Sequence, residues 1–173
     1  MDILIRTEDS QDIEAVYKVN LNAFDQKNEA ELVNALRISD AFVPELPLVA
    51  EADNQIVGHI LFSKIMISSE NGLLNESLAL APMAVEKRFQ KQGIGGRLIL
   101  AGLDKATELG YKSVIVLGHE HYYPKFGFAP AEKWSIRAPF DVPQQFFMAI
   151  ELIPDGLRDV SGTVIYPNEF SSV

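Results

Sequence analysis

The chain has 173 residues, with 15 Lys+Arg against 24 Asp+Glu for a formal net charge of −9, and it contains no cysteine. This length predicts one domain, because domains commonly span about 100–200 residues. The missing cysteines exclude a disulfide framework, a thiolate metal site and a cysteine nucleophile. With only three histidines we expect no metal site, and the acidic balance argues against binding to nucleic acid or to anionic membranes.

The hydropathy pattern predicts a protein without a membrane anchor. The longest uninterrupted apolar run covers residues 78–85, far fewer than the roughly 18–20 residues that span a bilayer. The first residues lack the basic flank and the small-residue cleavage site of a signal peptide. We therefore expect a cytoplasmic location.

Hydrophobic periodicity and turn-forming residues predict alternating helices and strands. Helices are expected where apolar residues recur at helical spacing, and strands where short apolar runs are bounded by turn residues. The predicted helices cover 13–24, 29–38, 94–109 and a short segment near 122–126. The predicted strands cover 3–6, 46–52, 56–67, 73–85 and 113–117, with strand-like stretches around 128, 134–138 and 146–152.

This order of elements predicts an α/β (α+β mixed) fold, in which one mixed sheet carries helices on its faces. We expect a single domain over residues 3–152. A C-terminal extension, 153–173, is expected to pack on this domain, with residues 163–166 forming one further strand or an ordered arm.

Isolated aromatic and histidine side chains are interpreted as packing residues. Phe24, Phe146 and Phe147 are expected in the core. His59 follows a glycine inside an apolar strand, so we interpret it as a satisfied core or edge residue instead of a ligand. Trp134 is expected to pack or to line a cleft.

A glycine-rich segment, Gln90–Gly96, lies between a predicted strand and a predicted helix. The first N–H groups of a helix have no intrahelical partner, and the helix dipole is positive there. Glycines let an anion approach these groups without a Cβ in the way. Lys87 to Arg97 holds four basic residues and no acidic one, so the segment predicts either an anion site or a glycine-rich turn with a solvated basic face.

Two common phosphate-binding motifs compete for this segment. The dinucleotide fingerprint needs a third glycine where this chain has Leu98, although Glu120 lies where a ribose-binding acid would follow. The loop of nucleotide triphosphatases is absent. The serine-hydrolase motif G-x-S-x-G and the zinc-protease motif H-E-x-x-H are also absent.

Two segments resemble motifs of the GNAT superfamily of N-acyltransferases. The strand 78–85, followed by Gln90-x-x-Gly93-x-Gly95, resembles that superfamily's acetyl-CoA pyrophosphate loop. The segment 123–128, Tyr-Pro-Lys-Phe-Gly-Phe, resembles its second hallmark, Y-x-x-x-G-F. One helix and one strand separate the two, as in the superfamily. The resemblance covers about residues 3–152 and is strongest to the YhbS-like subgroup.

The resemblance implies a fold, a reaction and a cofactor site. The implied fold is a mixed, mostly antiparallel sheet flanked by helices, with splayed central parallel strands. The implied reaction is transfer of an acetyl group from acetyl-CoA to a primary amine by direct attack in a ternary complex, without a metal. The implied cofactor-binding residues are Met83, Ala84, Val85, Gln90, Lys91, Gln92, Gly93, Ile94, Gly95, Gly96 and Arg97.

The resemblance also implies a catalytic tyrosine, whereas it leaves the identity of the general base open. Tyr123 lies where many members carry a tyrosine that protonates the CoA thiolate, and its neighbour Tyr122 is expected to pack between Phe126 and Phe128. The usual base on the central strand is missing, because residues 78–85 include no ionisable side chain. Among Glu120, His119 and His121 in the loop after the next strand, we prefer Glu120.

Two alternatives belong to other functional classes. The poor complement of bases is also typical of a non-catalytic acyl-CoA-binding regulatory module, and the same loop would suit a nucleotide-binding regulator. The acceptor is a small-molecule or protein amine, and the acidic surface favours a cationic one. A monomer and a homodimer are both compatible with the sequence.

Overall fold

The computed structural model describes residues 1–171. Three long helices and nine strands account for its regular structure, together with short 3₁₀ turns. The helices are α1 (Ile13–Phe24), α2 (Asn28–Arg37) and α3 (Ile94–Glu108). The strands are β1 (Ile3–Thr7), β2 (Leu48–Ala52), β3 (Gln55–Ser68), β4 (Leu74–Val85), β5 (Ser113–Leu117), β6 (Ala129–Pro130), β7 (Ile136–Arg137), β8 (Phe147–Glu151) and β9 (Gly162–Ile165).

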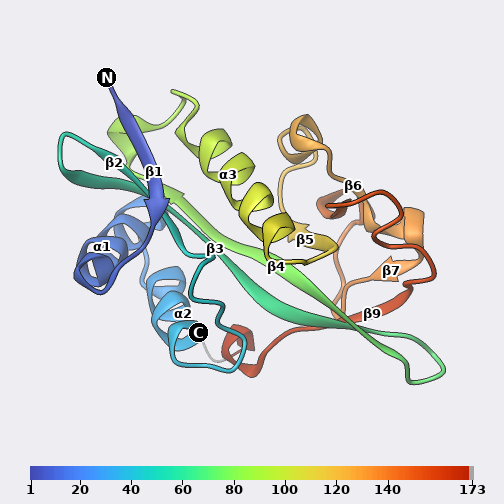
Figure 1. Ribbon diagram of the computed structural model, residues 1–173. Coiled ribbons are helices and arrows are strands. Elements are labelled where there is room, and N and C mark those ends of the chain that lie inside the picture. The colour runs from blue at the N-terminus through green and yellow to red at the C-terminus, as the bar shows by residue number, and fades with distance from the viewer. Residues whose placement is uncertain (172–173) are drawn as a thin grey trace.

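The nine strands form one sheet with the order β1-β2-β3-β4-β5-β8-β6, and β9 pairs with both β3 and β7. Within residues 1–171, only the pairs β4–β5 and β7–β9 are parallel. In Figure 1, α3 lies across one part of the sheet, and α1 and α2 lie together on its other side. The predicted fold class, a mixed and mostly antiparallel sheet flanked by helices, is confirmed.

The alternation of side chains along β3 explains how the two helical layers are held. Ile60 and Phe62 pack in the large core cluster that includes the buried face of α3. Leu61, between them, packs in the cluster with residues of α1 and α2. Successive residues of a strand point to opposite faces, so one long strand supports both helical layers.

The centre of the sheet is interrupted in two places. The pairing of β3 with β4 shifts between Ile60, opposite Met83, and Phe62, opposite Leu80, so that two β4 residues face one β3 residue, as in a β-bulge. The parallel strands β4 and β5 pair at only two positions, the last being Ala79 with Ile115. Beyond Ala79 the strands part, which confirms the predicted splay.

Helix α3 packs unusually close to the sheet at Gly102. A Cβ added to Gly102 would lie 2.2 Å from the ring of Phe62, a fully buried side chain of β3. The absence of a side chain on Gly102 therefore lets the helix rest on the phenylalanine ring.

Several local expectations need correction. Phe24 is 39% exposed, because it lies at the end of α1 beside a cavity and not in the core. The strand-like stretches around 128 and 134–138 contain only two-residue strands between 3₁₀ turns. His59 is fully buried as expected, but its Nε2 has no hydrogen-bond partner within the described residues, so it is not fully satisfied.

Candidate functional site

A cavity of about 430 Å³ lies between the carboxyl end of β4, the start of α3 and the end of α1, and we call it the loop cavity. All of the predicted cofactor residues line it except Gln92 and Arg97. The lining residues are Ala23, Phe24, Met83, Ala84, Val85, Phe89, Gln90, Lys91, Gly93, Ile94, Gly95, Gly96 and Tyr122.

The start of α3 presents backbone donors to this cavity. Gly93 precedes the first helical residue with a φ of 84°, and no side chain caps the helix. A Cβ at Gly93 would meet nothing within 4 Å, so the space before the helix is open. The side-chain amide of Gln90 donates to the carbonyl of Val85 at 2.9 Å, which holds the loop against the end of β4. The arrangement suits a phosphate group.

The basic residues of the loop face in different directions. The Nζ of Lys87 lies 2.6 Å from a carboxylate oxygen of Asp25, and Arg88 lies over the ring of Phe89. Arg97 donates to the carbonyl of Ile3 at 2.8 Å and lines a different hollow beside the N-terminus. Lys91 alone of the four lines the loop cavity, and it makes no ion pair among residues 1–171. The positive stretch therefore supplies one cation to the cavity.

The two adjacent tyrosines occupy different surroundings from those expected. Tyr122 meets Phe126 edge to face at 5.3 Å but also lines the loop cavity, with its hydroxyl against Gly95. Tyr123 is the one that packs against Phe128, at 5.7 Å. Burial raises the pKa of Tyr123 to about 12 and raises the pKa of Tyr122 as well. Tyr123 is therefore a weaker acid than a free tyrosine.

The candidate bases lie outside the loop cavity. Glu120 is partly buried, and its Oε1 lies 3.6 Å from the Nε2 of the exposed His121. The ring of His119, also exposed, accepts a hydrogen bond from the backbone N–H of His121 at 3.3 Å. None of these three residues lines the loop cavity.

A second pocket, of about 240 Å³, opens where β4 and β5 part, and we call it the aromatic pocket. Phe140 and Tyr166 are stacked with ring centres 6.2 Å apart, and Phe170 lies 5.1 Å from Tyr166. Burial raises the pKa of Tyr166 to about 12. Sequence reasoning missed these three residues, since they lie far from both motifs. The lining residues are Ala79, Leu80, Ala81, Ile115, Leu117, Phe140, Tyr166 and Phe170.

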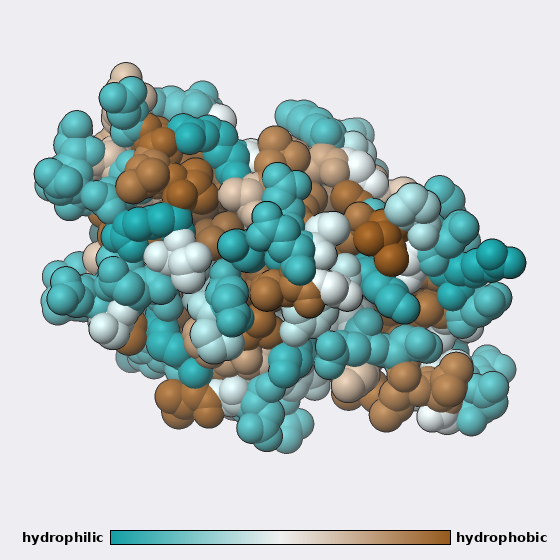
Figure 2. All heavy atoms as spheres, in the orientation of Figure 1, coloured by the Kyte–Doolittle hydropathy of each residue, from teal (hydrophilic) through white to brown (hydrophobic). Residues whose placement is uncertain are grey.

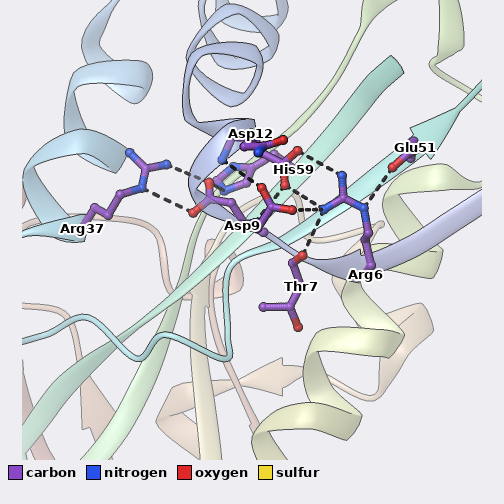
Figure 3. Close-up of polar contacts among 9 residues, drawn as sticks. Arg6, Thr7, Asp9, Asp12, Arg37, Glu51 and His59 are labelled. Atoms are coloured by element: carbon purple, nitrogen blue, oxygen red, sulfur yellow. Dashed lines mark hydrogen bonds and ion pairs between the residues drawn. The ribbon is translucent and has the colours of Figure 1, made fainter. Parts of the chain in front are cut away.

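A polar cluster around the buried His59 lies away from both cavities (Figure 3). Asn20 reaches the Nδ1 of His59 at 3.3 Å. Arg37 pairs with Glu8 at 2.7 Å, and the same Glu8 oxygen is 4.0 Å from the Nε2 of His59. Arg6 pairs with Asp12 at 2.7 Å beside this group. These contacts tie α1 and α2 to the first strands.

Among residues 1–171, no cluster of three or more histidine and carboxylate side chains is arranged to hold a metal ion. In the same range, no helix combines the length and the apolar character that crossing a bilayer requires.

Comparison with known proteins identifies the family of the chain. The model of the acetyltransferase (GNAT) family matches residues 13–128. The uncharacterized N-acetyltransferase YhbS of Escherichia coli is 32% identical over 170 residues, or 98% of this chain and 99% of YhbS. The uncharacterized N-acetyltransferase YjhQ of E. coli is 36% identical over 140 residues, or 79% of this chain and 76% of YjhQ.

Solved structures agree with this placement. The crystal structure of E. coli YhbS in complex with CoA matches with a TM-score of 0.90 and 31% identity, over 98% of this chain and 92% of that one. A GNAT family acetyltransferase from Brucella melitensis in complex with acetyl-CoA matches with a TM-score of 0.80 and 32% identity, over 98% of both chains.

The parted strands β4 and β5, with a glycine loop at their open end, define the class of acyl-CoA-dependent acyltransferases. The chain belongs to the acetyltransferase (GNAT) family and is similar to YhbS over nearly its whole length. The resemblance drawn from the two motifs is thereby confirmed.

Proposed function

We propose that the chain transfers the acetyl group of acetyl-CoA to a primary amine, with the cosubstrate held in the loop cavity. One observation carries this proposal. The open, uncapped start of α3 adjoins the edge of β4 that β5 has left. The helix start thus provides a site for a polyphosphate, and the unpaired edge of β4 provides a neighbouring site for an extended arm that carries amides.

The proposed contacts follow from that geometry. The N–H groups of residues 93–96 bind the pyrophosphate, with Lys91 as the nearby cation. The backbone groups of Met83, Ala84 and Val85 are not paired with β5. The amides of the pantetheine arm pair with these groups in the place of β5, like an added strand. Arg97 is left out of the proposed contacts, because its guanidinium is bound to Ile3. The relatives solved with CoA and acetyl-CoA support this assignment.

The reaction balances without a protein-bound intermediate. The amine nitrogen attacks the thioester carbonyl carbon, a C–N bond forms, and the C–S bond breaks with its electron pair leaving on sulfur. One proton passes from the nitrogen to the thiolate. No cysteine is present to form a thioester with the acyl group, which supports the proposed direct attack.

The attacking amine has to be neutral. A lysine-like amine with a pKa of about 10.4 is neutral in about one part in 2,500 at pH 7, which corresponds to about 4.6 kcal/mol. Residues 78–85 include no ionisable side chain. Glu120 remains the candidate base, but it lines neither pocket. The proposal therefore relies mainly on an apolar acceptor site, which favours the uncharged amine.

Tyr123 is proposed to stabilise the departing thiolate. With its pKa raised to about 12, full proton transfer to a thiolate of pKa about 8.5 is uphill by about 5 kcal/mol. Tyr123 therefore acts as a hydrogen-bond donor to the sulfur while charge develops there.

The non-catalytic acyl-CoA-binding module remains the second candidate, because no candidate base lines either pocket. Acetyl-CoA binding with no release of free CoA for any amine in a broad panel would favour it. A cytoplasmic location and a monomeric or homodimeric state are further parts of the proposal, as is the division at residue 152.

A ligand panel read by thermal unfolding tests the proposed function. A ligand at 100 times its Kd adds about 2.7 kcal/mol of stability. Acetyl-CoA is expected to raise the Tm, and NAD and ATP are not. Stabilisation by NAD or ATP but not by acetyl-CoA would overturn the proposal.

A further inference from the structure

The aromatic pocket begins where the parallel strands separate. Ala79 and Ile115 are the last paired residues of β4 and β5, and both line the pocket. The pocket continues over Ala81 and Leu117, past the last pair. Its lining on β4 therefore ends at Ala81, two residues before the proposed pantetheine contacts at residues 83–85.

The aromatic pocket opens on the face of the sheet opposite α3. Ala79 and Ile115 belong to the core cluster formed with the C-terminal segments. Their neighbours Leu78 and Val114 belong to the cluster that packs against α3. From Val85 to Ala81, β4 covers about 13 Å at 3.3 Å per residue. An arm that follows this edge inward from the loop cavity ends at the pocket.

The walls of the aromatic pocket carry no formal charge. Its lining consists of alanine and aliphatic side chains with three aromatic rings, and its one titratable group, Tyr166, is neutral at pH 7. Asp141 and Glu169, next in the chain to two of the rings, do not line it. An ammonium placed there would lose its hydration without an opposite charge in return.

We propose that the aromatic pocket holds the apolar body of the acceptor, so that the preferred acceptor is a primary amine attached to a single hydrocarbon ring. This inference rests on the proposed acetyl transfer. At about 240 Å³ the pocket is smaller than the roughly 300–1,000 Å³ typical of sites for drug-sized ligands, which suits one ring and a short linker. Linear diamines are disfavoured, because a second ammonium would enter the apolar space.

Acceptor kinetics at saturating acetyl-CoA test the inference. We expect kcat/KM for 2-phenylethylamine and cyclohexylmethylamine to exceed that for 1,4-diaminobutane at least tenfold. Phe140→Ala removes one wall of the pocket, and Phe140 is 47% exposed, so the fold tolerates the change. This variant is expected to raise the KM for 2-phenylethylamine about tenfold and to leave the KM for acetyl-CoA unchanged.

Ile165→Ala is the matched control. Ile165 precedes Tyr166, is 48% exposed and does not line the pocket. We expect the acceptor KM of this variant to equal that of the wild type. Equal losses in the two variants would mean that Phe140→Ala acts through the fold, and would overturn the inference.

Three further results would overturn the inference. The first is a higher kcat/KM for 1,4-diaminobutane than for the ring-bearing amines, and the second is an unchanged acceptor KM in Phe140→Ala. The third is a Phe140→Ala variant in which only the preference between acetyl-CoA and hexanoyl-CoA changes. The last result would assign the pocket to the acyl chain. Calorimetric titration of 2-phenylethylamine into the CoA complex gives a readout without turnover, and absence of binding there also contradicts the inference. Failure to bind acetyl-CoA at all would instead refute the proposed function.

Discussion

Tyr122 and Tyr123 are adjacent residues with different environments. Tyr122 lines the loop cavity, and Tyr123 packs against Phe128 with its pKa raised to about 12. If Tyr123 stabilises the thiolate, Tyr123→Phe lowers kcat by about 10²-fold or more and leaves the Kd for acetyl-CoA within about twofold. Tyr122→Phe is the matched control and is expected to keep kcat within a few-fold. The opposite ranking in steady-state kinetics would assign the role to Tyr122.

Two basic residues of the loop are expected to differ in their effect on acetyl-CoA binding. Lys91 lines the loop cavity, and the guanidinium of Arg97 is bound to Ile3. Lys91→Ala is expected to weaken acetyl-CoA binding about five- to tenfold, since a charge-assisted contact to phosphate is lost. Arg97→Ala is expected to change the Kd less than twofold. Titration calorimetry on both variants measures this, and a larger loss in Arg97→Ala would restore Arg97 to the site.

His59 is expected to make stability depend on pH. Burial and the nearby Arg37 lower the pKa of His59 to about 3, below its unfolded value of about 6.5. The unfolded chain then binds the proton first, so stability is full above pH 6.5 and falls as the pH drops toward 3. Between pH 7 and pH 5 the loss is about 2 kcal/mol.

Urea denaturation at pH 7 and at pH 5 measures this dependence in the wild type and in His59→Gln. Both pH values lie above the pH at which Asp12 takes up a proton, because Arg6 lowers the pKa of the Asp12 carboxyl group. The variant is expected to lose most of the difference between the two pH values. The same difference in both proteins would show that other groups cause it.

At the level of elements, α3 and β3 are fitted to each other at one point. Gly102→Ala removes a helix-breaking residue, a change that stabilises an exposed helix by about 1 kcal/mol. Here the added Cβ would lie 2.2 Å from the ring of Phe62, so we expect a net loss of about 1–3 kcal/mol. Chemical denaturation of Gly102→Ala, Phe62→Leu and the double variant tests this. In this double-mutant cycle, Phe62→Leu is expected to restore part of the stability that Gly102→Ala loses. Additive losses of stability would contradict the contact.

The elements that could be predicted from the sequence are those with their own periodic pattern. Helices α1 and α3 and strands β3 and β4 carry enough apolar residues to be located within one or two positions. Strands β6 and β7 have two residues each and are held by pairing with β8 and β9. Such strands have no local signal, because distant partners define them.

The same distinction holds for the sites. The loop cavity could be predicted because most of its residues are contiguous, from Met83 to Gly96. The direction of Arg97 could not, since it depends on where β1 lies relative to α3. The aromatic pocket joins residues 79–81 to Phe140 and Tyr166. Pairing of β9 with β3 brings the last segment there, and no sequence spacing encodes that contact.

At the scale of the whole molecule, charge and binding chemistry are separated. The net charge is −9, and the face seen in Figure 2 is mostly hydrophilic, with apolar side chains in small separate groups. The loop cavity nevertheless presents one lysine and a positive helix end, and the aromatic pocket presents no carboxylate. The expectation of a cationic acceptor, drawn from the net charge, stays a prediction, and the aromatic pocket adds the proposal that the amine is attached to an apolar ring.

Calorimetric titration with acetyl-CoA tests the central claim most directly, on the wild type and on Gly95→Val. Gly95 lies in the first turn of α3 and lines the loop cavity beside Tyr122 and Met83, so the added side chain occupies space proposed for the cosubstrate. Leu100→Ala, at an exposed position of α3, is the control. We predict one acetyl-CoA bound per chain in the wild type and the control, and at least tenfold weaker binding in folded Gly95→Val. No binding by the wild type, or equal binding by folded Gly95→Val, would contradict the account.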